Sequence, residues 1–379
     1  MEKRQRLLRK SLEYSATISQ LKFRWNQLQG WPRMYRQLMS EKDPVARKRI
    51  ELSFYTSVSI VLLDILVGAI IALTILYKPH AIFEPIQKAY LYLNNHILQS
   101  VVSWLMGSPA GLQMNRNLVV FLGTVSLTVV SYWDAVILGL ITSDYIDMEF
   151  RIAIVLCLFS FAGLSLLLSA LIDFSSIAFF HIFFVYAGLT RLWNLTVRII
   201  FTFTQLFRGK KYNILKLRVD GHEFDIEQLI LGTVFLSVVV FLLPTVMVCY
   251  LSFMLLWMGV LLLQLLLRAG VSVFSFFPVY LYWKSGSIPS KNAVVPRSDK
   301  DGNVRFEIQA QKLGKTAVVS EFFRAVLASI PVHEPISNTL MAVVRGTTLV
   351  FPKYAQHEQI NNSVDFGPSY TKLIRRISP

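Results

Sequence analysis

The sequence has few charged residues, few cysteines and few turn-forming residues for its length. Asp, Glu, Lys and Arg make up 16% of its 379 residues, whereas soluble domains average about 25%. Two cysteines are too few for a disulfide framework, and 18 glycines and 14 prolines are too few for a fibrous repeat. Acidic residues are scarcer than basic ones, 23 against 38, which leaves a formal net charge of +15. These shortages exclude disulfide-stapled and fibrous proteins and argue against an ordinary soluble domain.

Hydrophobic residues are abundant instead. They make up 54% of the chain, and its mean hydropathy is +0.50. Disordered chains lack apolar residues of this kind, so a disordered protein is excluded as well. The composition predicts an all-α polytopic membrane protein whose positive charges lie in the loops.

The apolar residues are gathered in long runs. A membrane-spanning helix needs about 20 of them, and we expect about six transmembrane helices, over residues 53–77, 117–141, 152–171, 174–190, 229–251 and 252–281. The last two come from one run, 229–283, which as a single helix would be about 80 Å long against a hydrocarbon core of about 30 Å. We therefore expect this run to fold back as a hairpin near Cys249–Phe253.

The predicted spans divide the chain into a basic N-terminal segment (1–52), a transmembrane domain (53–283) and a polar tail (284–379). Cytoplasmic loops are enriched in Lys and Arg. Six spans would place the N-terminal segment, the loop 191–228 and the tail on one side, together with most of the cations. We expect that side, with both termini, to be cytoplasmic. The N-terminal segment and residues 191–211 mix cations with apolar residues, which is typical of interfacial amphipathic helices.

The tail is expected to form a small cytoplasmic α+β appendage. Residues Val304–Gln309 alternate apolar and polar side chains, as in a half-buried strand. Residues Val318–Ile330 have the pattern of a helix, and Val343–Phe351 that of a second strand around Gly346.

Four ionisable residues lie within the predicted spans: Asp64, Asp134, His181 and Arg268. Such residues are costly in lipid and are functional candidates by default. Pairing inside the helix bundle, or snorkelling to an edge of the membrane, is nevertheless the simpler explanation for each of them.

Other patterns of catalytic or metal chemistry are weak. No segment has the strand–helix alternation and Gly-rich turn of a nucleotide-sugar fold. The sequence Asp299-Lys300-Asp301 runs into Gly302-Asn303, which is turn chemistry. Cys157 and Cys249 lie in separate spans without the spacing of zinc ligands. We therefore expect no metal, no cofactor and no self-contained catalytic apparatus.

Two polar islands are denser than membrane loops require, and each is a candidate surface for partner subunits or phospholipid headgroups. Glycine and proline set a tight turn in the first island, and Asn115-Arg116 can cap the helix that follows. Arg and Lys in the second island can pair with phosphates. The candidate residues are Trp104, Gly107, Pro109, Gly111, Asn115 and Arg116 in the first island, and Phe207, Arg208, Gly209, Lys210, Lys211, Asn213, Arg218 and Asp220 in the second.

Five stretches resemble the family of the Q subunit of phosphatidylinositol N-acetylglucosaminyltransferase, the N-acetylglucosaminyl transferase component of glycosylphosphatidylinositol (GPI) anchor synthesis. They are W-L-M-G-S-P-A-G-L at 104–112 with M-N-R at 114–116, L-F-R-G-K-K at 206–211, R-V-D at 218–220, D-I-E-Q-L at 225–229 and F-L-L-P-T at 241–245. The resemblance covers roughly residues 100–280. The chain departs from the family pattern at Gln113 and Tyr212, and it has a shorter segment before the first span.

The resemblance implies a non-catalytic, multi-pass subunit in the endoplasmic reticulum membrane. Its complex transfers N-acetylglucosamine from UDP-GlcNAc to phosphatidylinositol, while a separate subunit carries the glycosyltransferase fold. The implied partners are the other subunits, including the catalytic one, and the phosphatidylinositol-containing membrane; nucleic acid is not expected.

Two other classes of function remain open at this point. A membrane-embedded acyltransferase or other lipid-modifying enzyme would use His181 with Asp134. A transporter would use Asp64, Asp134 and Arg268, although the sequence has no inverted repeat of the kind that transporters show.

Overall fold

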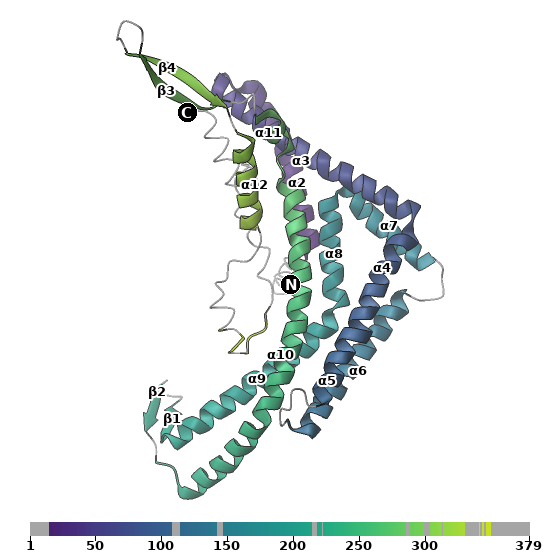
Figure 1. The fold of residues 1–379 in the computed structure, drawn as a ribbon, viewed down its shortest axis with the longest axis vertical. Coiled ribbons are helices and arrows are strands. Elements are labelled where there is room, and N and C mark those ends of the chain that lie inside the picture. The colour runs from purple at the N-terminus through teal and green to yellow at the C-terminus, as the bar shows by residue number, and fades with distance from the viewer. Residues whose placement is uncertain are drawn as a thin grey trace, which may run out of the picture.

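The computed structural model describes residues 15–107, 114–141, 147–213, 218–221, 223–285, 289–298, 304–312, 314–329, 341, 343–344 and 346–349. The described part is predominantly helical, with two small antiparallel strand pairs (Figure 1). Its helices are α2 (Ala16–Ser40), α3 (Pro44–Tyr77), α4 (Pro79–Tyr92), a π-helix η1 (Leu93–Leu98), α5 (Gln99–Met106), α6 (Arg116–Ile141), α7 (Asp147–Ala162), α8 (Leu164–Ala178), α9 (Phe180–Phe207), α10 (Ile226–Phe276), α11 (Val279–Lys284) and α12 (Lys315–Ser329). Strand β1 (Lys210–Asn213) pairs with β2 (Arg218–Gly221), and β3 (Pro289–Ser298) pairs with β4 (Val304–Lys312).

Three of the described helices are long and apolar enough to cross a membrane: α3 from Ala46, α6 to Ile137, and α10. Helices α8 and α9 are long and apolar enough only when they are taken together. They are bent by 55° at their junction, and they make a fourth span if the bent pair is counted as one. An all-α membrane protein is therefore supported, with three to four candidate spans by length and composition in the described part, against the six expected.

The hairpin expected near Cys249–Phe253 is wrong, because α10 runs without a break for 51 residues. Cys249, Tyr250 and Phe253 are helical and buried. Two helices cover α10 in succession, so neither half needs the other as its partner. Phe203 of α9 stacks on Phe235 in the first half, and Gln264 in the second half bonds to Ser176 of α8.

The breaks in the following region also differ from those expected. Helix α7 ends at Ala162, Gly163 has a φ of 137°, and α8 then ends before Phe179. Helix α9 continues to Phe207, so residues 191–207 extend a helix that begins inside the predicted fourth span. A φ of this size favours glycine, which explains why the chain breaks at Gly163.

The main core lies where α5, α6, α9 and α10 meet. Its buried residues include Leu98, Val102, Val130, Tyr186, Tyr250, Phe253 and Trp257. A second cluster joins the tail to the membrane helices, because Val318 and Phe322 of α12 pack with Leu52 of α3 and Phe276 of α10.

The tail elements are partly as expected. Strand β4 confirms the strand over Val304–Gln309, and α12 confirms the helix over Val318–Ile330 up to Ser329. The strand expected over Val343–Phe351 is wrong in its described residues, since Val343 and Val344 are helical and Gly346 forms a turn with a φ of 65°. The positive φ of Gly346 interrupts the extended backbone that a strand requires, and its close contact with Trp193 and Thr190 of α9 leaves little room for a Cβ. The turn predicted at Asp299–Asp301 lies outside the described residues.

Candidate functional site

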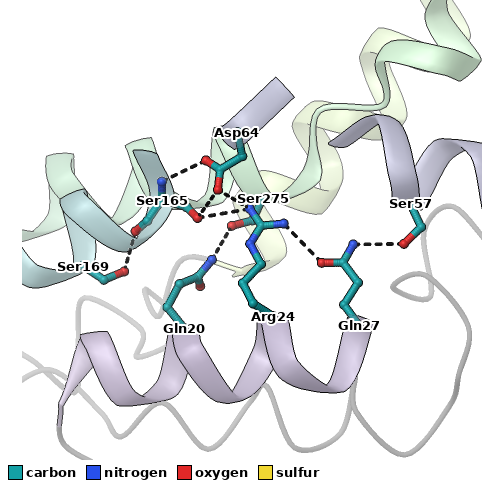
Figure 2. A network of polar contacts seen from close by, with 8 residues as sticks. All are labelled: Gln20, Arg24, Gln27, Ser57, Asp64, Ser165, Ser169 and Ser275. Atoms are coloured by element: carbon teal, nitrogen blue, oxygen red, sulfur yellow. Dashed lines mark hydrogen bonds and ion pairs between the residues drawn. The ribbon is translucent and has the colours of Figure 1, made fainter. Parts of the chain in front are cut away.

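A buried network of polar side chains is centred on Asp64, midway along α3 (Figure 2). The Asp64 carboxylate is 1% exposed. Its Oδ1 accepts a hydrogen bond from the backbone N–H of Ser165 at 2.8 Å, and its Oδ2 accepts one from the Ser165 hydroxyl at 2.7 Å. Ser165 lies in the first turn of α8, whose own N-cap residue supplies no side-chain bond. Asp64 therefore caps α8 from a neighbouring helix, where a negative charge is favourable.

The positive partner of Asp64 comes from the N-terminal segment. Arg24 of α2 donates from Nη2 to Asp64 Oδ2 at 2.8 Å and to Ser165 Oγ at 3.1 Å. Burial lowers the pKa of the Arg24 guanidinium, and Asp64 opposes that shift. A buried pair of this kind is held by mutual charge and hydrogen bonding, and loss of either partner leaves an uncompensated charge.

Around this ion pair, the backbone of α3 lies very close to the backbone at the α7–α8 break. A Cβ at Gly163 would overlap the Asp64 carboxylate, and one at Gly68 would overlap the carbonyl oxygen of Ser160. The Ser160 hydroxyl instead donates to the Gly68 carbonyl at 2.7 Å. Small residues thus let α3 cross the α7–α8 break closely, as small residues do between membrane helices.

Helix α2 is fixed along the bundle by further polar bonds, and Figure 2 shows those of Gln20 and Gln27. Gln20 donates to Ser275 of α10 at 2.9 Å, and Gln27 donates to Ser57 of α3 at 3.1 Å. At the other end of α8, Asp173 accepts from the backbone N–H groups of Ala16 and Thr17 and so caps α2. The N-terminal segment was expected at the membrane surface; in the structure its helix presents polar side chains inward to α3, α8 and α10.

The other intramembrane candidates do not converge into one site. Asp134 accepts hydrogen bonds from the Tyr90 hydroxyl at 3.0 Å and from Asn94 at 2.6 Å. Burial, together with Asp134, raises the pKa of the Tyr90 phenol well above its ordinary value. His181 is buried beside the α8–α9 bend, and within the described residues neither ring nitrogen has a hydrogen-bond partner. His181 and Asp134 are therefore not joined by a hydrogen bond, and Arg268 lies half-buried on α10.

Metal chemistry finds no support in the part of the chain that the structure describes. No group of three or more His, Cys, Asp or Glu residues there could hold a metal ion. Cys157 and Cys249 are both buried and free.

The first polar island anchors α6. The Asn115 side chain accepts from the backbone N–H of Leu118 at 3.0 Å, which confirms the predicted cap. The Asn115 backbone N–H donates to Thr245 Oγ1 at 2.9 Å, so this island touches the F-L-L-P-T stretch of α10. Trp104 on α5 and Arg116 on α6 are exposed, and Gly107 ends α5. Pro109 and Gly111 lie outside the described residues.

The second island forms the tip of a helical hairpin, which we call the α9–α10 arm: residues 195–207 of α9, β1, β2 and residues 226–241 of α10. It forms the lower end of the molecule in Figure 1. Arg208 caps the end of α9, and Gly209, with a φ of 61°, turns the chain into β1. Lys211 pairs with Asp220 and Asn213 with Arg218 across the two strands, and Arg208, Lys210 and Arg218 are exposed. Arg218 also forms a 2.6 Å ion pair with Asp220.

The flanks of the arm are apolar and exposed on both helices. Gly232 lets Leu206 approach α10 closely, which holds the two helices together. The exposed apolar side chains are Leu195, Val197, Phe201 and Phe207 on α9, and Ile226, Ile230, Leu231, Val234, Phe235, Val238, Val240 and Phe241 on α10. The arm therefore combines a basic tip with apolar sides, a surface suited to lipid or to the membrane helices of another protein.

Comparison with known proteins identifies the family. The model of the N-acetylglucosaminyl transferase component (Gpi1) family matches residues 18–290, more than half of the chain. The chain belongs to this family. The Gpi1 match begins in α2, so it includes Arg24 and the rest of the buried network as well as both polar islands.

Relatives of this Gpi1-family chain are found in yeasts and mammals. It is 29% identical over 274 residues to the N-acetylglucosaminyl-phosphatidylinositol biosynthetic protein gpi1 of Schizosaccharomyces pombe, which covers 71% of this chain and 41% of that protein. It is 36% identical over 184 residues to the human phosphatidylinositol N-acetylglucosaminyltransferase subunit Q, covering 48% of this chain and 23% of the human protein. It is 25% identical over 292 residues to subunit GPI1 of Saccharomyces cerevisiae, covering 71% of this chain and 48% of that protein. The chain thus spans less than half the length of each of these relatives, and no solved structure matches it.

Proposed function

We propose that this chain is a non-catalytic membrane subunit that assembles and stabilises a phosphatidylinositol N-acetylglucosaminyltransferase complex. The complex would transfer N-acetylglucosamine from UDP-GlcNAc to phosphatidylinositol in the endoplasmic reticulum membrane, the first step of GPI-anchor synthesis. Relatives bear the name of a subunit of this transferase, which supports membership of such a complex. The remaining subunits, including the catalytic one, are the proposed partners.

The observation that carries the proposal is the α9–α10 arm. Its exposed apolar flanks offer a surface for the membrane helices of a partner, and its basic tip offers cations to an anionic lipid headgroup. The carboxylates of the buried Asp64 and the half-buried Asp134 are already engaged in internal hydrogen bonds. We place the basic tip on the cytoplasmic side. Because α10 is one continuous helix between the tip and residues 284–379, the tip and the tail cannot both be cytoplasmic if α10 crosses the membrane once.

The test removes the charge of the tip. The variant with Arg208, Lys210 and Lys211 all changed to Ala is expected to recover several-fold less of the transferase subunit on affinity purification in mild detergent, and to make less product. The matched control changes the exposed cations Arg33, Arg36 and Lys42 to Ala, which removes the same charge elsewhere. If the tip variant and the control recover the same amount of transferase subunit and product as the wild type, the assignment of the tip is wrong.

A further inference from the structure

A short segment of the tail lies across α9 and α10. We call its residues Met341–Leu349 the strap, of which 341, 343–344 and 346–349 are described. Four aromatic side chains meet it, two from each helix: Tyr186 and Trp193 of α9, and Tyr250 and Trp257 of α10. These four residues are the aromatic clamp.

Every one of the four clamp side chains makes a hydrogen bond to the strap backbone. Trp193 donates to the carbonyl of Val344 at 3.2 Å, and Tyr250 donates to that of Val343 at 3.1 Å. At the far end of the strap, Trp257 donates to the carbonyl of Leu349 at 2.8 Å, and the Leu349 N–H donates to the Tyr186 hydroxyl at 3.1 Å. Because all of these bonds go to the main chain, they depend on the conformation of the strap backbone and not on the identity of its side chains.

Three of the clamp side chains stack on one another, and the clamp is largely buried. The Trp193 and Tyr250 rings are stacked, with centroids 5.8 Å apart and an interplanar angle of 2°, and Tyr250 stacks on Tyr186 at 6.2 Å. Tyr186, Tyr250 and Trp257 are 0%, 1% and 6% exposed. Buried polar groups that lose their partners destabilise a protein. The clamp therefore favours an occupant that presents backbone carbonyls and an N–H at these positions.

The strap meets the clamp with a specific spacing of residue types. Val343 and Leu349 pack against the main core. Gly346 lies between them with a φ of 65°, and a Cβ there would be 2.9 Å from Trp193 Cδ1 and 3.2 Å from the Thr190 carbonyl oxygen. The clamp thus fits a segment with an aliphatic residue at its first contact position. A glycine follows three positions later, and a second aliphatic residue three positions after the glycine.

The clamp lies at the base of the α9–α10 arm. Trp193 is two positions before the arm begins on α9, and Tyr250 follows its end on α10. A segment bonded to both helices at this point restricts how they move against each other, and hence where the arm points.

From these contacts we propose that the aromatic clamp is a peptide-binding site for the chain's own strap, and that the bound strap fixes the direction of the α9–α10 arm. The first half stands on the contacts alone. The second half rests on the proposed function, because it assigns the arm a docking role. Because the strap and the clamp belong to one chain, their association is intramolecular, which corresponds to an effective concentration on the order of millimolar and favours the strap over other peptides at the clamp.

The first experiment measures amide hydrogen exchange of the strap in the full chain in detergent. Gly346→Ala is expected to speed exchange at Leu349 about ten-fold, because a left-handed backbone with a Cβ and the contact with Trp193 both oppose binding. Gly188→Ala is the matched control, since Gly188 lies on α9 with open space around its Cα. Tyr250→Phe, which removes one donor and keeps the ring, is expected to speed exchange about five-fold.

Two results would overturn the clamp: a wild-type strap that exchanges as fast as a free peptide, or equal protection in Gly346→Ala and the wild type. The second experiment recovers the transferase subunit with the same variants. A released strap with reduced recovery supports the role in fixing the arm, whereas a released strap with normal recovery rejects that role and leaves the clamp intact. If the wild-type chain recovers no transferase subunit, the proposed function fails, while the exchange experiment still decides the clamp.

Discussion

Arg24 and Asp64 are 40 residues apart in the sequence, yet Nη2 of Arg24 and Oδ2 of Asp64 lie 2.8 Å apart in the interior. The pair joins α2 to α3, and through Ser165 it also fixes the start of α8. Three elements from different parts of the chain are therefore held at one point.

Removing the negative charge is expected to destabilise the whole bundle. Asp64→Asn should lower the free energy of unfolding by about 3–5 kcal/mol, because it leaves the Arg24 guanidinium buried without a counter-charge. Thermal unfolding in detergent measures the change. The control is Asp220→Asn, which removes an exposed ion pair worth at most about 1 kcal/mol. A double variant with Arg24→Gln should lose less than the sum of the single changes; strictly additive losses would show that the pair is not coupled.

The close crossing of α3 and the α7–α8 break gives a second prediction. Gly163→Ala should destabilise by about 2 kcal/mol or more, because the backbone is left-handed and the new Cβ overlaps the Asp64 carboxylate. The same substitution at Gly139, which has open space around it, should be neutral or slightly stabilising. Equal melting temperatures for the two variants would contradict the packing described.

The cap on α6 gives a third prediction. Asn115→Ala should cost about 1 kcal/mol and speed amide exchange in the first turn of α6, because the N–H of Leu118 loses its acceptor. Asn115→Asp retains an acceptor oxygen and serves as the control. Unchanged exchange in the alanine variant would show that the side-chain cap contributes nothing.

A substitution at His181 distinguishes the proposed non-catalytic subunit from a lipid-modifying enzyme. Since neither ring nitrogen has a partner among the described residues, His181→Leu should leave stability nearly unchanged. It should also leave the transferase activity of the purified complex at the wild-type level. A folded His181→Leu chain whose complex is inactive would instead favour the lipid-modifying alternative.

The sequence predicted the kind of protein and several local features, since these depend on short stretches of chain. Apolar runs located α3, α6 and α10, and the cap at Asn115 followed from residue types next to each other. The family resemblance was confirmed by the match over residues 18–290. The lone carboxylate of Asp64 within a span correctly suggested an internal partner.

What the sequence could not supply were contacts between distant segments. The N-terminal 52 residues contain many cations, and nothing local distinguishes Arg24 as the one that meets Asp64. Helix α10 was divided in two because length alone was weighed, while the succession of partners that lets it stay unbroken belongs to the tertiary structure. The strap was interpreted as a strand, because alternating side chains do not reveal that aromatic residues some 90 and 160 positions away bind its backbone.

The uninterrupted course of α10 has a mechanical consequence. At 1.5 Å per residue its 51 residues measure about 75 Å, and no ordinary tilt accommodates such a rod within a hydrocarbon layer of about 30 Å. A large part of α10 must therefore lie outside the hydrocarbon layer. Because α10 is continuous, we expect a displacement of its end near α12 to reach the opposite end, beside the cations of β1 and β2.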